Sequence, residues 1–297
     1  MKYIKEPITI ESQVQRLKER GLKFDNEPKA AHYLSHISYY RLRAYTYPFQ
    51  DNNDENHPFI TSVSFEDIIN LYVFDRKLRL LLFNFIEKIE IAFRAQIVYN
   101  FSLVHGSHWQ LKPELYRDPM RFANHLDSLQ KEIDRSNETF IDHYKNKYTN
   151  PTEPPCWMSL EVASIGLLSK IFSNLKKGAE KKKVAANFGL NDISLLENWM
   201  HCLSNLRNVC AHHGRVWNRR VNQIKFPTNP SMPFIQNKSV YPNKLYATIC
   251  CIEYILKIIS PKNTIKDKIK ELMDGCPLKQ EKEMGFPNDW RKDPFWN

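Results

Sequence analysis

Apolar residues recur at helical spacing along most of the chain, and the longest such stretch has neither proline nor glycine between Ser64 and His105. Residues 64–67 resemble a capping box, which marks the start of a helix. The apolar residues that share one face of this long helix, or of two nearly collinear helices, are Leu71, Phe74, Leu78, Leu81, Leu82, Phe85, Ile89 and Phe93. The stretch also carries two i,i+4 charge pairs, interpreted as ordinary helix-stabilising pairs worth roughly a few tenths of a kcal/mol each: Asp75 with Arg79 and Glu90 with Arg94.

Shorter segments show the same spacing and are separated by residues that end helices. One helix is predicted from Ile10 to Arg20, where Gly21 stops it. A second begins near Asn26, ahead of Pro28, and runs into residues 39–43. Further helical segments are predicted at residues 118–147, 157–175, 191–214 and 246–259, with irregular structure at residues 50–63 and 214–242.

These segments predict an all-α fold in three parts. An N-terminal helical extension covers residues 1–62, a helical core covers residues 63–275, and a polar C-terminal tail over residues 276–297 is expected to be loosely attached. Only 8 glycines in 297 residues weigh against an all-β or Rossmann-like chain, which needs frequent turns or a glycine-rich loop. With 42% hydrophobic residues the chain has ample material for a packed core.

The apolar runs and the cysteines indicate in which cellular compartment the protein is expected. No apolar run reaches the roughly 18 residues of a membrane span, and residues 1–7 lack the apolar centre of a secretory signal. We therefore expect a cytoplasmic protein with no membrane partner. The 6 cysteines are scattered and expected to be reduced. Several of them join histidines in a local group, but its spacing does not fit a zinc finger, so we expect no metal and no cofactor: His201, Cys202, Cys210, His212 and His213.

The charge balance favours a polyanionic partner. The chain has 43 basic and 33 acidic residues, a net charge of +10, which suits RNA, although many basic proteins bind no nucleic acid. Five lysines fall within residues 176–183, among them Lys181, Lys182 and Lys183. Such a cluster forms either a solvated turn or a surface that steers phosphate.

Arg207, Asn208 and His212, near the end of the predicted helix over residues 191–214, carry the strongest chemical indication. Histidine can both take and give a proton near neutral pH, so it can serve RNA cleavage that uses the ribose 2′-OH as nucleophile. The arginine fork holds a phosphate and opposes the charge that develops on it. The asparagine would orient either group.

Helix geometry restricts how these three groups meet. Asn208 and His212 lie one turn apart on a polar face, whereas Arg207 lies about 140° from His212 around the axis. One regular helix cannot aim both at one phosphate, which favours a site completed by a second copy in a symmetric dimer. A structural interpretation stays open, in which His212 caps the helix end and Arg207 ties helices together through one of four carboxylates: Asp75, Glu87, Glu90 or Glu161.

The surrounding residues carry a resemblance. Arg207-Asn208-x-x-x-His212 matches the Arg-x(4 to 6)-His signature of the HEPN ribonucleases, and residues 205–219 look like the hallmark of the AbiD/AbiF-like abortive-infection proteins of bacteria and prophages. Three further segments resemble the rest of that family in order: residues 39–49, the run 71–79 that leads to 89–94, and residues 155–161. The resemblance spans roughly residues 10 to 260.

The resemblance implies a HEPN-type helical bundle behind the N-terminal extension, and an endoribonuclease toxin of a phage-defence or toxin–antitoxin system. It would cleave RNA without metal through Arg207, Asn208 and His212, leaving a 2′,3′-cyclic phosphate. The resemblance also implies a homodimer and, in some relatives, a small non-coding RNA that acts as antitoxin.

Further basic residues are candidates for contacts to RNA outside the central triad. Arg215, Arg219 and Arg220 follow the helix and would hold flanking phosphates, although solvated loop charges would look the same. Arg41 and Arg43 alternate with tyrosines, a mixture that suits stacked bases, although an aromatic set at helical spacing more often belongs to a core. The alternative function is a non-catalytic HEPN-fold module that binds RNA or another partner.

Overall fold

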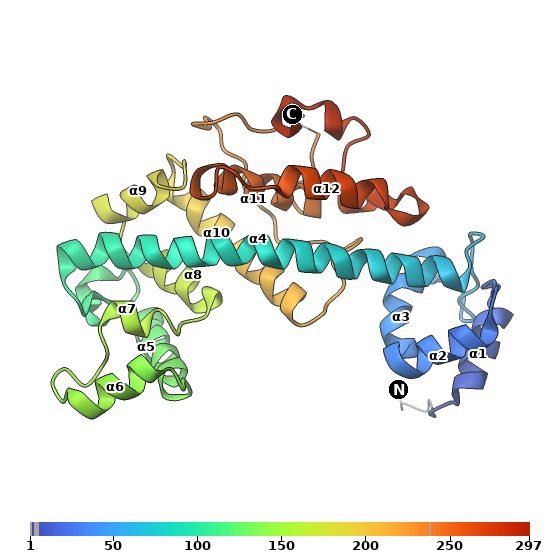
Figure 1. Cartoon of the computed structure of the whole chain (residues 1–297), viewed down its shortest axis with the longest axis horizontal. Coiled ribbons are helices and arrows are strands. Elements are labelled where there is room, and N and C mark those ends of the chain that lie inside the picture. Colours follow the sequence, from blue (N-terminus) through green and yellow to red (C-terminus); the bar gives the residue numbers. More distant parts are fainter. Residues whose placement is uncertain (1, 3–5, 238) are drawn as a thin grey trace. The chain divides into compact units, whose positions relative to one another are not determined.

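The computed structural model describes residues 2, 6–237 and 239–297, and every regular element in this part of the chain is a helix (Figure 1). The predicted all-α fold class is therefore confirmed. The α-helices are α1 (Ile10–Glu19), α2 (Glu27–Ile37), α3 (Tyr39–Thr46), α4 (Phe65–His105), α5 (Pro119–Asp134), α6 (Thr139–Lys147), α7 (Cys156–Ser159), α8 (Ile165–Asn174), α9 (Ala179–Ala186), α10 (Ile193–Ala211), α11 (Leu245–Ile259) and α12 (Ile265–Asp274). Short 3₁₀ helices are η1 (Tyr47–Phe49), η2 (Trp109–Leu111), η3 (Pro113–Leu115), η4 (Pro277–Met284), η5 (Trp290–Lys292) and η6 (Pro294–Trp296).

The chain packs as two compact units. One comprises Met1–Arg79 with Glu271–Glu281, and the other comprises Leu80–Lys270 with Lys282–Asn297. The predicted segments 1–62, 63–275 and 276–297 stay a prediction. No helix in the described residues combines the length and the apolar character that crossing a membrane requires.

In the first unit, capping side chains set the helix limits. The side chain of Asn26 accepts from the backbone of Lys29 to start α2, as expected. The predicted run into residues 39–43 is broken, however, because Ser38 takes a left-handed conformation with φ of 71° and its side chain caps α3 instead.

The start of α4 also follows the sequence. The side chains of Ser64 and Asp67 each accept a hydrogen bond from the other's backbone N–H, at 3.1 and 2.9 Å, and form the expected capping box. From there α4 continues for 41 residues as one helix. The charge pair Asp75–Arg79 corrects our interpretation, since both side chains are buried and the Tyr45 hydroxyl donates to Asp75 at 2.6 Å.

In the second unit, α10 packs against α8, α9 and α11. Its predicted apolar stripe is buried, and α11 is buried from Leu245 to Leu256. The stripe consists of Leu196, Trp199, Leu203, Leu206 and Cys210. Burial of this many apolar side chains is what fixes α10, and with it the segment that carries Arg207, Asn208 and His212, in the fold.

Two expectations are wrong in this unit. The predicted helix over residues 157–175 is split into α7 and α8, because Ser164 caps α8 and its own backbone N–H donates to Glu132 at 2.7 Å. The C-terminal tail is not loosely attached: Trp290 and Trp296 are buried, and the Trp296 indole donates to the Tyr246 hydroxyl at 2.8 Å. Aromatic rings, scattered in the sequence, gather into one cluster there.

Candidate functional site

The helix that carries the Arg-Asn-x-x-x-His segment is fixed at both ends. At its start the Asp192 carboxylate accepts from the Ser194 hydroxyl at 2.7 Å and from the Ser194 backbone N–H at 2.8 Å, and these two hydrogen bonds lower the pKa of Asp192. At its end His213 is left-handed with φ of 57°, and the backbone N–H of Gly214 donates to Val209 at 2.8 Å. This is a Schellman ending, with histidine at the position that glycine usually takes.

After this ending the chain returns alongside α10. The Asn198 side chain accepts from the backbone N–H of Lys225 at 2.7 Å and donates to the carbonyl of Gln223 at 3.1 Å. The Trp199 indole donates to the carbonyl of Lys225 at 2.7 Å. The irregular segment predicted at residues 214–242 is thus tied to the helix by polar contacts.

An open pocket of about 700 Å³ lies between the end of α10 and the returning chain. His212 is exposed, and its side chain makes no hydrogen bond to the described residues. The polar residues that line the pocket are Asn205, Asn208, His212, Arg219, Arg220 and Asn222. Asn208 and His212 therefore share one cavity with two of the arginines that were expected to hold phosphate.

Two asparagines of the pocket converge on one imidazole. The side-chain nitrogens of Asn205 and Asn222 lie 3.1 and 3.5 Å from Nε2 of His201. Sequence patterns did not indicate Asn222 or His201 as site residues, because Asn222 approaches the helix only when the chain folds back. The sole sequence indication was the local histidine group.

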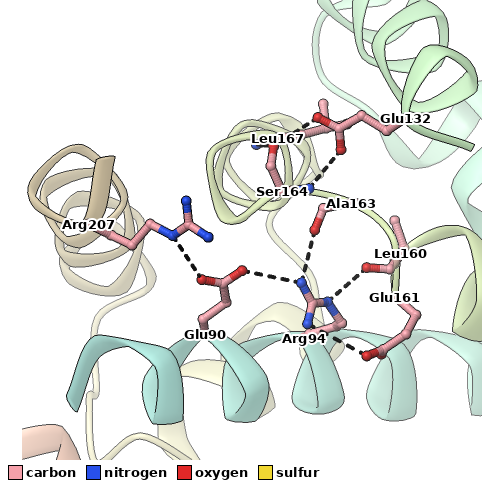
Figure 2. Close-up of polar contacts among 9 residues, drawn as sticks. All are labelled: Glu90, Arg94, Glu132, Leu160, Glu161, Ala163, Ser164, Leu167 and Arg207. Atoms are coloured by element: carbon pink, nitrogen blue, oxygen red, sulfur yellow. Dashed lines mark hydrogen bonds and ion pairs between the residues drawn. The ribbon is translucent and has the colours of Figure 1, made fainter. Parts of the chain in front are cut away.

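Arg207 does not line this pocket and lies against α4 instead (Figure 2). Its guanidinium lies over the ring of Phe83, 5.3 Å from the centroid, and its Nε is 3.6 Å from Glu90. Its two terminal nitrogens donate no hydrogen bond to the described residues. Of the four carboxylates predicted as partners, Glu90 takes that place, while Asp75 pairs with Arg79 and Glu161 lies near Arg94.

The remaining basic candidates fall at separate places. Lys182 and Lys183 are exposed on α9. Lys181 corrects our expectation: it is fully buried, donates to Glu197, and lies over the ring of Phe172, so its ammonium is committed inside the unit. Desolvation accordingly lowers the pKa of Lys181.

Three other predicted arginines lie away from the pocket lining. The Arg215 guanidinium lies over Trp217, 5.6 Å from the ring centroid. Arg41 is exposed and Arg43 half-buried on α3, in the other unit, where Tyr40 is 85% exposed. The tyrosines around them therefore differ in burial: Tyr40 is exposed, whereas Tyr45 belongs to the core.

The local cysteine and histidine group was the remaining candidate. In the described part of the chain, no three His, Cys, Asp or Glu side chains come together as metal ligands. Cys202 borders the pocket, and burial raises the pKa of its thiol to about 11, which keeps it protonated and unreactive at neutral pH.

Fold and site together define an all-α protein in which one helix ends in an exposed histidine beside a polar, arginine-bearing pocket. Residues 32–218 match the model of the family described as Abi-like protein. This match covers more than half of the chain and includes Arg207, Asn208 and His212, so the chain belongs to the Abi-like family. Family membership indicates a role in abortive infection, a defence against phage. No curated protein and no solved structure matched the chain.

Proposed function

We propose that this chain is a metal-independent endoribonuclease of an abortive-infection or toxin–antitoxin system. In this proposal His212 is the general acid or base, Arg207 binds the scissile phosphate, and Asn208 supports both. The observation that carries it is the pocket of about 700 Å³ in which Asn208 and His212 meet Arg219 and Arg220. An imidazole beside cationic side chains, in a cavity open to solvent, suits a phosphodiester that is cleaved by proton transfer.

The chemistry follows from the groups present. The 2′-oxygen attacks the adjacent phosphorus and loses its proton to a base, and the bond from phosphorus to the 5′-oxygen breaks as that oxygen gains a proton. The products are a 2′,3′-cyclic phosphate and a 5′-hydroxyl. DNA is expected to resist cleavage because it lacks the nucleophile.

The proposed site is completed by a second copy of the chain. Arg207 contacts α4 and lies outside the lining of the pocket that holds His212, so the two groups face different surroundings within one chain. A two-fold dimer would supply the missing half, because symmetry presents each surface to its equivalent.

The test is cleavage of labelled single-stranded RNA in EDTA. We expect His212→Ala to lower the rate about 100- to 10,000-fold and Arg207→Ala to lower it about 100- to 1,000-fold. His143→Ala and Arg121→Ala are matched controls, since both side chains are exposed in the same unit, and should keep full activity. Equal cleavage of RNA and DNA, or full activity in the His212 variant, would overturn the proposal.

Mixing the two inactive variants tests the dimer. If Arg207 and His212 of one site come from different chains, an equal mixture of Arg207→Ala and His212→Ala regains activity, up to about a quarter of the wild-type rate. A mixture that stays inactive while native mass spectrometry shows mixed dimers would exclude a shared site.

The proposed partners are a substrate RNA and a small non-coding RNA antitoxin. The net charge of +10 suits both. Protein purified together with its native genomic neighbourhood should carry one defined RNA, and its absence would count against the antitoxin. RNA that is bound yet never cleaved would instead support the non-catalytic binding module.

A further inference from the structure

The geometry points to Glu90 as the positioning residue of Arg207, with Arg94 fixing Glu90 from its other side. This inference rests on the proposed function, because it assigns Glu90 to the guanidinium that would bind the scissile phosphate. It concerns the three side chains drawn at the centre of Figure 2, two from α4 and one from α10.

Arg94 is the fixed end of the arrangement. Its Nε donates to the carbonyl of Leu160 at 2.8 Å, and one terminal nitrogen donates to the carbonyl of Ala163 at 2.9 Å. Both carbonyls belong to the turn between α7 and α8, whose last residue, Ser164, is held by two hydrogen bonds to Glu132 (Figure 2). Arg94 therefore has little freedom to move away from Glu90.

Glu90 lies between two cations. One carboxylate oxygen is 3.4 Å from Arg94 and the other is 3.6 Å from Nε of Arg207, and the Glu90 side chain is only 12% exposed. A largely buried carboxylate with an anchored partner has few alternative orientations. Because Arg94 shares its charge, Glu90 does not neutralise Arg207 fully.

Arg207 is the end that faces outward. Glu90 lies on the Nε side of the guanidinium and the ring of Phe83 lies against its face, while Figure 2 joins neither terminal nitrogen to a labelled residue and shows one of them pointing away from Glu90. Its side chain is 33% exposed, so these nitrogens are within reach of a ligand. The two terminal nitrogens form the fork that grips two phosphoryl oxygens at once. A fork already held in place loses less freedom on binding.

A purely structural ion pair predicts something different. If Glu90 only tied α4 to α10, its loss would lower stability and leave turnover per folded molecule unchanged. A positioning residue instead lowers kcat, because a displaced fork still meets substrate but no longer meets the transition state.

The first measurement is turnover of a 5′-labelled single-stranded RNA by Glu90→Gln. We expect kcat to fall by about 10- to 100-fold with KM changed less than about threefold. Glu87→Gln is the matched control, since Glu87 is exposed on the same helix one turn earlier, and should match the wild type. In an Arg207→Ala background, Glu90→Gln should cause no further loss. Thermal unfolding of each variant confirms that the fraction compared is folded.

The second measurement does not depend on activity. NMR relaxation of the Nε–H group of Arg207 should report an ordered side chain in the wild type and in Glu87→Gln, and a mobile one in Glu90→Gln. An equally ordered Arg207, or an unchanged kcat, in Glu90→Gln overturns the inference. If the wild type cleaves no RNA but Arg207 loses order in Glu90→Gln, the proposed function fails while the positioning role stands.

Discussion

Two acid–arginine pairs on α4 have the same i,i+4 spacing but different surroundings. Asp75 and Arg79 are sealed, with side chains 0% and 5% exposed, and burial raises the pKa of Tyr45, which keeps its hydroxyl protonated as a donor to Asp75. Glu90 and Arg94 instead face a third charge, Arg207, whose outer nitrogens stay uncommitted. A closed polar cluster secures the fold, and an open one leaves binding capacity for a ligand. Spacing alone does not distinguish them.

The largest expected effect on stability comes from removing the carboxylate of the buried Asp75–Arg79 pair. Asp75→Ala leaves a buried guanidinium without its carboxylate and should lower the free energy of unfolding by about 3 to 5 kcal/mol. Glu90→Ala should lower it by only about 1 to 2 kcal/mol, because the Arg207 side chain is 33% exposed and Arg94 keeps its hydrogen bonds to two backbone carbonyls. Urea denaturation of both variants measures the contrast.

The control for the sealed pair removes both charges. Asp75→Leu with Arg79→Met should recover most of the stability lost in Asp75→Ala, since no buried charge is left unpaired. If the Asp75→Ala and Glu90→Ala variants lost equal free energy of unfolding, the proposed difference between the buried pair and the partly exposed pair would be wrong.

A smaller effect is expected where α10 ends beside the pocket. A Cβ atom on Gly214 would lie 3.1 Å from Val209 Cγ1 and 3.2 Å from the Val209 carbonyl oxygen. Gly214→Ala should therefore cost about 1 to 2 kcal/mol in thermal unfolding and, by shifting His212, reduce RNA cleavage. Gly275→Ala is the control, because its Cβ would meet only an ordinary contact at 3.8 Å. A Gly214 variant as stable and active as the wild type would show that this ending tolerates movement.

The smallest effect is expected at the other end of α10 and depends on pH. The two hydrogen bonds from Ser194 lower the pKa of Asp192 below its ordinary value of 3.8. Such a carboxylate stabilises the fold above its unfolded pKa, and that contribution disappears as pH falls through the folded pKa. Asp192→Ala should thus lose about 1 kcal/mol at pH 7 and less near pH 3. Asp192→Asn caps the helix without a charge, so any loss in its free energy of unfolding should not change with pH in the way expected for the carboxylate.

The sequence predicts the long apolar helices well, because α4, α10 and α11 each bury a continuous stripe that is visible as spacing. It also predicts that Asn208 and His212 face one side, since one turn of helix separates them. It does not predict the burial of Lys181 or the packed tail, which depend on Glu197 and on Tyr246 from other helices. Local spacing holds no information about such partners.

The Glu90–Arg207 contact shows the same limit in the site. Four carboxylates were equal candidates from composition and helix position, and only packing of α10 against its neighbours decides among them. The sequence therefore shows that Arg207 is a cation, but only the folded structure shows that Glu90 is its counterion.

The return of the chain after α10 makes the pocket a local structure. Every residue of its lining falls between Cys202 and Asn222, so a short loop closes it at small entropic expense. The helix supplies the floor through apolar packing, and the returning segment supplies the rim through Arg219, Arg220 and Asn222. Substitutions at Arg219, Arg220 or Asn222 would therefore change the charge and polarity of the pocket without changing the apolar packing of α10.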